Sequence, residues 1–166
     1  MKTDRQKEPD REKPRIRVSM AELYPTLCEV IGQGRLFRIP VTGTSMIPTI
    51  QGDWDEVLIG KAEFPLKKYD IPLYRRDNGQ FVLHRVISVE PDGTYTCCGD
   101  HQWVKEPGIR PDQIVGAAAF FIRKGKQIDL QSAGFRRWSR FWHALMPIRR
   151  PLVALYSKFQ KLHKKK

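Results

Sequence analysis

One serine and one histidine carry the chemistry that this sequence most readily supports. Ser45 lies in residues 41–53, between Gly43 and Pro48, where neither a helical nor a strand periodicity continues. Gly43 can adopt backbone geometries that other residues avoid, and Pro48 fixes its own φ, so we expect a sharp turn. A serine on such a turn acts as a nucleophile when a base and oxyanion-binding N–H groups lie nearby. A segment rich in Gly, Thr, Ser and Pro is also typical of an ordinary structural turn.

The candidate base is His84, in the segment 80–90 with the sequence QFVLHRVISVE. Its β-branched and aromatic residues predict a strand, and Pro-Asp-Gly at 91–93 predicts the turn that ends it. With a period of two, Val82, His84 and Val86 share one face. A desolvated imidazole there would serve as a general base near neutral pH. A core histidine satisfied by one backbone hydrogen bond is the alternative.

Several short blocks, taken together, resemble the type I signal peptidase and LexA-type serine peptidase superfamily over residues 34–125. In chain order they are TGTSMIPTI at 42–50, GD at 52–53, LKKYDI at 66–71, VLHRV at 82–86, CGDH at 98–101 and IVG at 114–116. Their shared order is more specific than any one block. VLHRV is similar to the branch that uses a histidine base, the endoplasmic-reticulum type. The resemblance implies a nucleophile at Ser45, a base at His84, a peptide or precursor-protein substrate and no cofactor.

A carboxylate that holds the histidine tautomer would strengthen this base. In the histidine branch that acid lies a few residues beyond the Gly-Asp pair, which here is Gly99-Asp100. Glu106 is the closest carboxylate at that offset, and Asp100 is the alternative. A structural turn role for both residues remains open.

The resemblance also indicates which residues would hold the oxyanion and the substrate. Leader peptidases of the family place an oxyanion-binding serine two positions before the nucleophile, and this chain has Gly43 there. Thr42 or Thr44 would then substitute, or the backbone N–H groups would act alone. Met46 follows the serine in a stretch that contacts substrate in the family, although core packing would explain it equally well. Val82, on the face of the histidine, completes the expected binding set.

Two residues depart from the family pattern. Tyr69 stands where the family usually has glycine, and Pro72 stands where it usually has a β-branched residue. Proline cannot donate to a β ladder, so we expect its strand to be an edge strand or to carry a bulge.

Composition and local pattern predict a mainly β protein. The 12 glycines and 12 prolines lie among short apolar runs, which is typical of a turn-rich β fold. Ser19 and Glu22 form a capping-box pattern for a short N-terminal helix, which would otherwise begin at Tyr24. Together with the resemblance this indicates a compact LexA/signal-peptidase-like β fold with a short N-terminal helix and amphipathic C-terminal helices. We expect strands at 35–41, 54–59, 71–74, 80–90, 94–98 and 114–123.

The charge distribution divides the chain into three parts. Residues 1–17 carry 7 basic and 4 acidic groups, residues 18–132 carry 13 and 14, and residues 133–166 carry 10 and none. We therefore expect a disordered charged arm at 1–17, a peptidase domain at 18–132 and a basic helical tail at 133–166. Because the excess charge lies outside the body, a nucleic-acid-binding core is not indicated.

The tail shows a helical pattern in which aromatic and basic residues take opposite faces. Trp138, Phe141, Trp142 and Leu145 lie on one face, opposite Arg136, Arg137 and Arg140. This pattern is typical of a helix lying on an anionic membrane surface, so we expect residues 135–166 to contact one. Packing on the domain or on a partner protein is the alternative, and nucleic acid binding is the weakest. No stretch is long and apolar enough for a signal peptide or a transmembrane helix, so we expect a cytoplasmic or peripheral membrane location.

Two other functions remain open at this point. A self-cleaving regulator of the LexA type would need a cleavage site in its own chain, and Ala133-Gly134 is a small pair of that kind. A peptide-binding module that has lost turnover would share the fold. A metal site is not expected, because the adjacent Cys97 and Cys98 would chelate one ion poorly.

Overall fold

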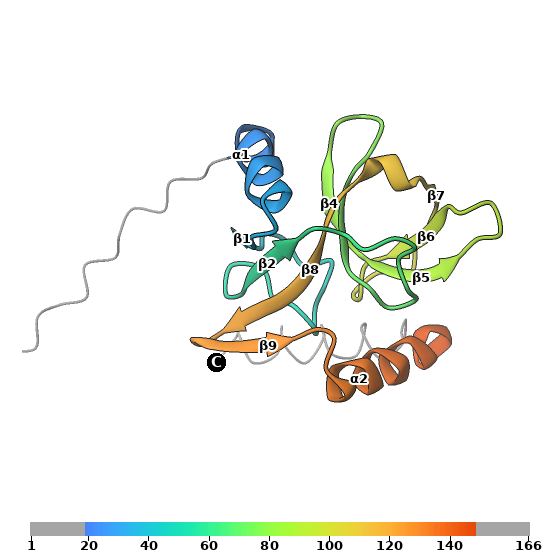
Figure 1. Cartoon of the computed structure of the whole chain (residues 1–166). Coiled ribbons are helices and arrows are strands. Elements are labelled where there is room, and N and C mark those ends of the chain that lie inside the picture. Colours follow the sequence, from blue (N-terminus) through green and yellow to red (C-terminus); the bar gives the residue numbers. More distant parts are fainter. Residues whose placement is uncertain (1–18, 149–166) are drawn as a thin grey trace, which may run out of the picture.

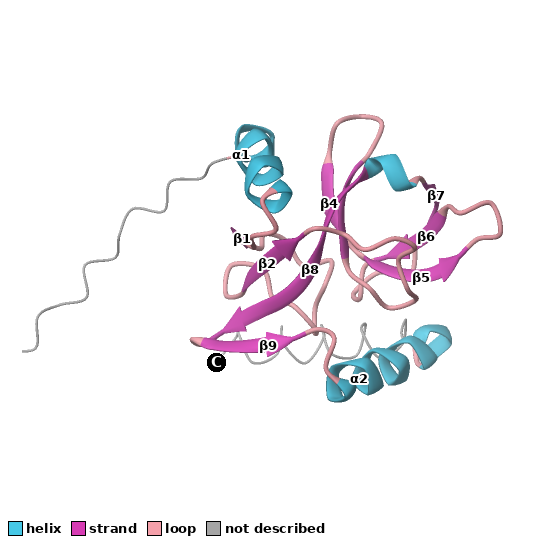
Figure 2. Cartoon of the chain, in the orientation of Figure 1, coloured by secondary structure: helices cyan, strands magenta, loops and turns pink. Residues whose placement is uncertain are grey.

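The computed structural model describes residues 19–148, in which strands predominate (Figure 1, Figure 2). In chain order its helices and strands are α1 Met20–Gly32, β1 Phe37–Pro40, β2 Glu56–Gly60, β3 Pro72–Arg75, β4 Phe81–Leu83, β5 Arg85–Val89, β6 Tyr95–Cys98, β7 Glu106–Ile109, β8 Ile114–Arg123, β9 Lys126–Asp129 and α2 Ala133–Ala144. Short 3₁₀ turns lie at Pro111–Gln113 and Met146–Ile148. The predicted mainly β class, with a short N-terminal helix and a C-terminal helix, is confirmed.

The strands form two antiparallel sheets that share no strand. The larger sheet has the order β1-β2-β8-β3-β4, with β9 also paired to β8, and the smaller has the order β5-β6-β7. The long strand β8 is central. Strand β2 pairs along one of its edges, and on the other edge β3 pairs with its first half and β9 with its second half. In Figure 1 it crosses the middle of the molecule, with α1 at the upper left and α2 at the lower right.

Helix α1 begins as the capping box predicts. The side chain of Ser19 accepts from the backbone N–H of Glu22, and the carboxylate of Glu22 accepts from the backbone N–H of Ser19. The helix therefore starts at Met20 and tolerates a proline in its second turn. Leu27 and Ile31 are its buried residues, so α1 covers the larger sheet with one apolar face.

The strand predicted for residues 80–90 is wrong in one respect that matters for the site. The chain leaves the larger sheet at the end of β4 and enters the smaller sheet at the start of β5, and His84 is the residue between them. The predicted alternation still places Val82 and Val86 on the same side of the chain, since both pack in the smaller apolar cluster. The imidazole therefore lies at the junction of the two sheets.

Proline 72 has the structural effect expected of it. Strand β3 is internal, between β8 and β4, and its pairing with β8 is irregular between Leu73 and Tyr74. The strand thus carries a bulge just after the proline, and Pro72 itself is the first residue of β3, a position where a missing donor is tolerated. The turn after β3 places Gly79 at φ +85°, which completes the hairpin with β4.

Helix α2 packs on the folded body, although the predicted boundary between a domain at 18–132 and a tail at 133–166 falls just before it. Phe135 lies in the main core, Ser139 is fully buried, and the indole N–H of Trp142 donates to the carbonyl of Asp100 at 3.0 Å. Phe135 holds α2 to the body by apolar packing, and Ser139 and Trp142 hold it by hydrogen bonds. The predicted arm at 1–17 and the rest of the tail, from residue 149, lie outside the described residues.

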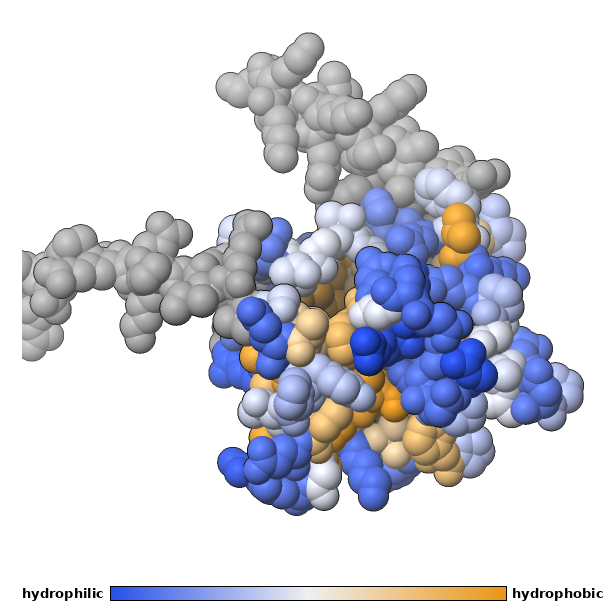
Figure 3. Space-filling view, turned by 90° about the horizontal axis from the view of Figure 1, so that it is seen from above, coloured by the Kyte–Doolittle hydropathy of each residue, from blue (hydrophilic) through white to orange (hydrophobic). Residues whose placement is uncertain are grey.

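Two apolar clusters make the core. The larger packs α1, the larger sheet and Phe135 of α2 around residues such as Leu27, Ile50 and Ile59. The smaller consists of Leu66, Tyr74, Val86, Tyr95, Cys97 and Ile109. Seen from above, apolar atoms reach the surface as a strip between hydrophilic flanks (Figure 3). Within residues 19–148, no helix combines the length and apolar character needed to cross a bilayer.

Candidate active site

The loop that carries Ser45 is closed by its own backbone. The N–H of Asp53 donates to the carbonyl of Val41 at 2.8 Å, and the N–H of Val41 donates to the carbonyl of Asp55 at 3.2 Å. Gly43 has φ +81°, the left-handed region that favours glycine. Gly52 packs so closely on it that a Cβ there would lie 1.9 Å from the Gly43 carbonyl oxygen. The sharp turn predicted around the serine is therefore present.

A second segment fixes the backbone of Ser45 from the other side. The N–H of His101 donates to the Ser45 carbonyl at 2.8 Å. Gly99 approaches the same carbonyl closely enough that a Cβ would lie 2.6 Å from its oxygen. The Gly-Asp-His block thus lies against the serine turn, which explains why these two distant motifs belong to one site.

Ser45 is half-buried and lines a cavity of about 710 Å³. The lining residues are Thr44, Ser45, Arg76, His101, Gln102, Trp103, Val104 and Glu106. Trp103 and Val104 are exposed, so one part of the wall is apolar, while Arg76 and Glu106 provide charge at another. A cavity of this size and mixed character suits a few residues of a peptide.

His84 does not line this cavity, but it contacts Glu106, which does. Its side chain is 4% exposed, and its Nδ1 lies 3.1 Å from Oε1 of Glu106. The hydroxyl of Tyr74 lies 3.3 Å from the same Nδ1 and donates to Oε2 of Glu106 at 3.0 Å. Of the two predicted acids, Glu106 is therefore the one in contact with the imidazole. Ser45 lines the same cavity as Glu106, and within the described residues no hydrogen bond joins Ser45 to His84.

The surroundings of His84 favour a neutral imidazole. Burial lowers its pKa below the ordinary value of 6.5, and the charge of Arg76 acts in the same direction. The charges of Glu106 and Asp100 oppose this shift without cancelling it. An ionised carboxylate can only accept, so the hydrogen between the two groups belongs to Nδ1. Nε2 then carries the lone pair that a general base requires.

Glu106 itself remains ionised. Burial acts to raise its pKa, but the hydrogen bonds from Arg76 and Tyr74 and the charge of Arg76 outweigh burial and bring the pKa below its usual value. Both nitrogens of the Arg76 fork contact the carboxylate, Nε at 2.8 Å from Oε2 and Nη2 at Oε1. The site therefore combines an ionised acid with a neutral histidine.

Asp100 is placed differently from Glu106, because both of its oxygens accept from one arginine. Arg85 donates Nε to Oδ1 at 2.8 Å and Nη2 to Oδ2 at 2.7 Å, and both side chains are 2% exposed. Nη1 of Arg85 also donates to Ser139 of α2 at 2.8 Å and to the carbonyl of Tyr69 at 3.2 Å. This network anchors the loop that holds the Ser45 carbonyl, so the contacts of Asp100 are those of a structural residue. Its charge still raises the pKa of His84 slightly.

The other predicted binding residues divide between the surface and the core. Thr42, Gly43 and Thr44 are exposed, and Thr44 lines the cavity. Met46 is 2% exposed and belongs to the main core, so the core-packing alternative holds for it and substrate contact does not. Val82 is half-buried beside the smaller cluster, opposite Tyr74 in the β3–β4 ladder.

Tyr74 and Arg76 are functional candidates that the sequence analysis missed. A signal existed for Tyr74, because the Asn78-Gly79 turn sets the register that places it opposite Val82, diagonal to His84. Arg76 lies in the turn itself, and no local pattern in the sequence distinguishes it from its neighbour Arg75.

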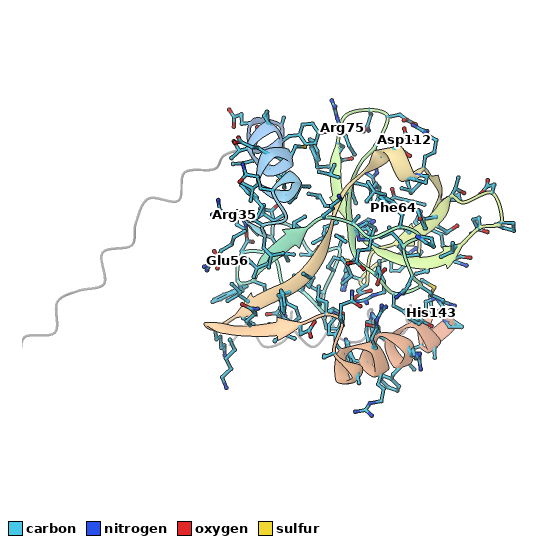
Figure 4. All side chains as sticks on the ribbon, viewed as in Figure 1. Arg35, Glu56, Phe64, Arg75, Asp112 and His143 are labelled. Carbon is cyan, nitrogen blue, oxygen red and sulfur yellow. The ribbon has the colours of Figure 1, made fainter. Side chains whose placement is uncertain are left out.

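Tyr69 adopts a backbone conformation that favours glycine. Its φ is +80°, in the left-handed region, although it carries a bulky side chain. The carbonyl of Tyr69 accepts from Arg85, and its ring lies 5.5 Å from the ring of His143 on α2, with an edge-on geometry. The tyrosine thus adds a contact to α2 in a backbone conformation that glycine adopts more readily. Figure 4 labels His143 on this helix.

Burial makes the Cys97 thiol next to the site a poor nucleophile. Burial raises the pKa of Cys97 to about 12, and the negative charge of Glu106 acts in the same direction. Within the part of the chain that the structure describes, no three His, Cys, Asp or Glu side chains are grouped so that they could hold a metal ion.

Comparisons with protein-family profiles, curated proteins and solved structures return no match for this chain.

Proposed function

We propose that this protein is a serine endopeptidase of the signal-peptidase-like type that cleaves an extended peptide segment. The observation that carries the proposal is the shared position of Ser45 and Glu106 on one cavity, with the carboxylate 3.1 Å from Nδ1 of His84. An ionised acid in contact with an imidazole, with a serine hydroxyl on the same cavity as that acid, supplies the three groups that activate a serine nucleophile. The order of the sequence blocks, which resembles that superfamily, supports the same conclusion.

In the proposed reaction, Nε2 of His84 takes the proton of the Ser45 hydroxyl while Oγ attacks the scissile carbonyl carbon. The resulting oxyanion is held by the Ser45 backbone N–H, with the hydroxyl of Thr44 or Thr42 nearby. The imidazolium returns its proton to the leaving amine, and an acyl-enzyme remains. Water, deprotonated by the same imidazole, then releases the acid and restores Ser45. Glu106 stabilises the imidazolium throughout.

An edge strand supports the expectation of an extended substrate. In the described chain β4 pairs with β3 along one edge and with no other strand, and it ends next to His84. A peptide that pairs with this edge by strand addition would lead its scissile bond toward the histidine. Trp103 and Val104 supply apolar wall for its side chains.

Acylation by a fluorophosphonate probe tests the proposal. The wild type should become labelled at Ser45, and intact-mass analysis should show one adduct. Ser45→Ala and His84→Ala should abolish labelling, whereas Ser88→Ala, on strand β5 away from the cavity lining, should leave it unchanged. Labelling that survives Ser45→Ala would exclude Ser45 as the nucleophile. Absence of labelling in a folded wild type would favour the alternative of a peptide-binding module without turnover.

Action on other polypeptides is favoured over self-cleavage of the LexA type. The small pair Ala133-Gly134 forms the first residues of α2, and peptidases of this kind bind their substrates extended. Cleavage there would require the helix to unwind from its cap at Ser132. Intact mass followed over days, compared with Ser45→Ala, should show a stable wild-type chain.

The exposed face of α2 supports the proposal of a peripheral location at an anionic membrane surface. Phe141 is 57% exposed and lies near Arg137 and Arg140, which are also exposed. An exposed aromatic side chain beside basic residues can enter the headgroup region of an anionic membrane while the basic residues contact the headgroups. The remaining basic residues of the predicted tail lie beyond residue 148. Cosedimentation with vesicles containing phosphatidylglycerol, but not with pure phosphatidylcholine, is the expected result.

A further inference from the structure

Four donors converge on the carboxylate of Glu106. Oε1 lies 3.1 Å from Nδ1 of His84 and also accepts from Nη2 of Arg76. Oε2 accepts from the hydroxyl of Tyr74 at 3.0 Å and from Nε of Arg76 at 2.8 Å. Only one of these four contacts belongs to the proposed catalytic pair, so the others must have another role.

The fork of Arg76 fixes the plane of the carboxylate. A guanidinium that donates through two nitrogens to two oxygens allows one relative orientation, unlike a single hydrogen bond. Glutamate has one more rotatable bond than aspartate and therefore needs more restraint to present one oxygen to the imidazole. In this protein that restraint comes from outside the histidine strand.

Arg76 is itself held in place by the turn that carries it. Its N–H donates to the carbonyl of Gln80 at 2.8 Å, and Nη1 donates to the side chain of the same residue at 2.5 Å. Its carbonyl accepts from the N–H of Gly79 at 2.8 Å. The side chain is 32% exposed and lines the cavity. A rigid turn thus holds the guanidinium at the edge of the site.

We propose that Arg76 is a positioning residue, which holds the Glu106 carboxylate in the one orientation in which it accepts from Nδ1 of His84. This proposal rests on the peptidase function proposed above. It assigns to the β3–β4 turn a part of the site that neither the serine turn nor the histidine strand supplies.

The charge of Arg76 has a second effect on the same histidine. The charged and titratable groups around the imidazole are Glu106 on β7, Tyr74 on β3, Asp100 after β6 and Arg76 itself; Cys97 on β6 acts on Glu106 and Tyr74. The two carboxylates raise the pKa of His84, and Arg76 lowers it. Removing the guanidinium charge should therefore raise this pKa, while loss of the fork should loosen the carboxylate.

The experiment compares Arg76→Gln and Arg76→Lys with Arg75→Gln. Arg75 precedes Arg76 in the chain, is exposed, and lies at the hairpin far from α2 in Figure 4, with its guanidinium over the rings of Tyr24 and Phe81. Each variant is titrated by NMR at the imidazole Cε1–H groups, and its fluorophosphonate labelling rate is measured against pH. The four histidines of the chain make assignment practicable.

In Arg76→Gln, the titration midpoint of His84 should rise by about half to one pH unit, and the rise of labelling rate with pH should move the same way. The plateau rate should fall about tenfold. Arg76→Lys should restore the midpoint, because it keeps the charge, but not the plateau, because it lacks the fork. If Arg76→Gln does not fold, the plateau rates of Arg76→Lys and the wild type can still be compared. Arg75→Gln should change neither quantity.

Failure of this proposal and failure of the peptidase proposal are distinguishable. Labelling of the wild type together with an unchanged midpoint and plateau in Arg76→Gln would overturn the role of Arg76 alone. Absence of labelling in the wild type would overturn the peptidase proposal. Arg76 would then have no role in catalysis, even if the titration midpoint of His84 rose in Arg76→Gln as expected.

Discussion

Replacing Asp100 or Glu106 by its amide should have different effects: the first should mainly lower stability, and the second should mainly lower the labelling rate. Asp100→Asn leaves the guanidinium of Arg85, which is 1% exposed, without its buried counter-charge. Removing one partner of a buried ion pair costs about 3–5 kcal/mol, a large part of the roughly 5–15 kcal/mol that stabilises a typical domain. For a chain of this size the unfolding midpoint should fall by on the order of 10–20 °C. Labelling of Ser45, measured on the folded fraction, should change less than tenfold.

Glu106→Gln should behave in the opposite way. Its partner Arg76 is 32% exposed, so solvent screening limits the loss of that ion pair to about 1 kcal/mol. The amide also leaves a donor of His84 or Tyr74 without its acceptor, and the total loss of stability should remain below that of Asp100→Asn. The neutral amide cannot stabilise an imidazolium, however, and the labelling rate should fall on the order of 10²–10⁴-fold. The pair of variants thus distinguishes an anchoring acid from an orienting one.

The assay combines thermal unfolding, followed by circular dichroism, with the second-order rate constant of fluorophosphonate labelling at 20 °C. Asp112→Asn is the matched control, because that carboxylate is 71% exposed on the 3₁₀ turn before β8 (Figure 4) and should affect neither quantity. The assignment of roles would be refuted if Asp100→Asn lowered the labelling rate as strongly as Glu106→Gln while its unfolding midpoint stayed near the wild-type value.

Three further predictions follow from the same geometry. Gly52→Ala should lower stability by about 1–3 kcal/mol and slow labelling, because its Cβ would overlap the carbonyl of Gly43; Gly32→Ala, where a Cβ meets no atom within 4 Å, should do neither. The folded state holds the pKa of His84 below 6.5, so its contribution to stability is complete above that pH and is lost as the pH falls through the lowered pKa. Urea unfolding between pH 7.5 and 5 should therefore show a smaller loss of stability in His84→Gln than in the wild type, and equal losses would contradict the lowered pKa. Tyr74→Phe should keep the fold and reduce the labelling rate about three- to tenfold, since it removes only the hydroxyl that donates to the acid; a wild-type rate would show that the hydroxyl is dispensable.

The sequence predicted the site best where the chemistry is local. The serine turn follows from a glycine and a proline a few residues apart, and the helix start follows from Ser19 and Glu22, because capping and turn geometry depend on near neighbours. The histidine strand was harder. Its residues have strand propensity throughout, and nothing local indicates that the chain changes sheets at His84. That break depends on how the two sheets pack.

The choice between Asp100 and Glu106 could not be made from the sequence for a related reason. Both lie near the required offset, and the difference between them is the position of Arg85, which captures Asp100 in a buried pair. Arg85 directly follows His84 in the chain, so its side chain projects to the other side of the strand. Contacts of this kind join residues that are distant in sequence, and a single sequence does not encode them in any short pattern.

The helical tail shows how an amphipathic pattern can have two explanations at once. The aromatic residues predicted for a membrane face include Trp142, whose indole N–H donates to Asp100, and Trp138, whose indole N–H lies 3.4 Å from the hydroxyl of Thr49 in the serine loop. Their rings stack at 5.7 Å, so the helix uses them to brace both halves of the site. Phe141 extends outward from this pair at 57% exposed. Contact of α2 with lipid would therefore involve Phe141, the exposed part of Trp138 and the exposed arginines, and it would act directly on the helix that contacts the serine loop and the Asp100 loop.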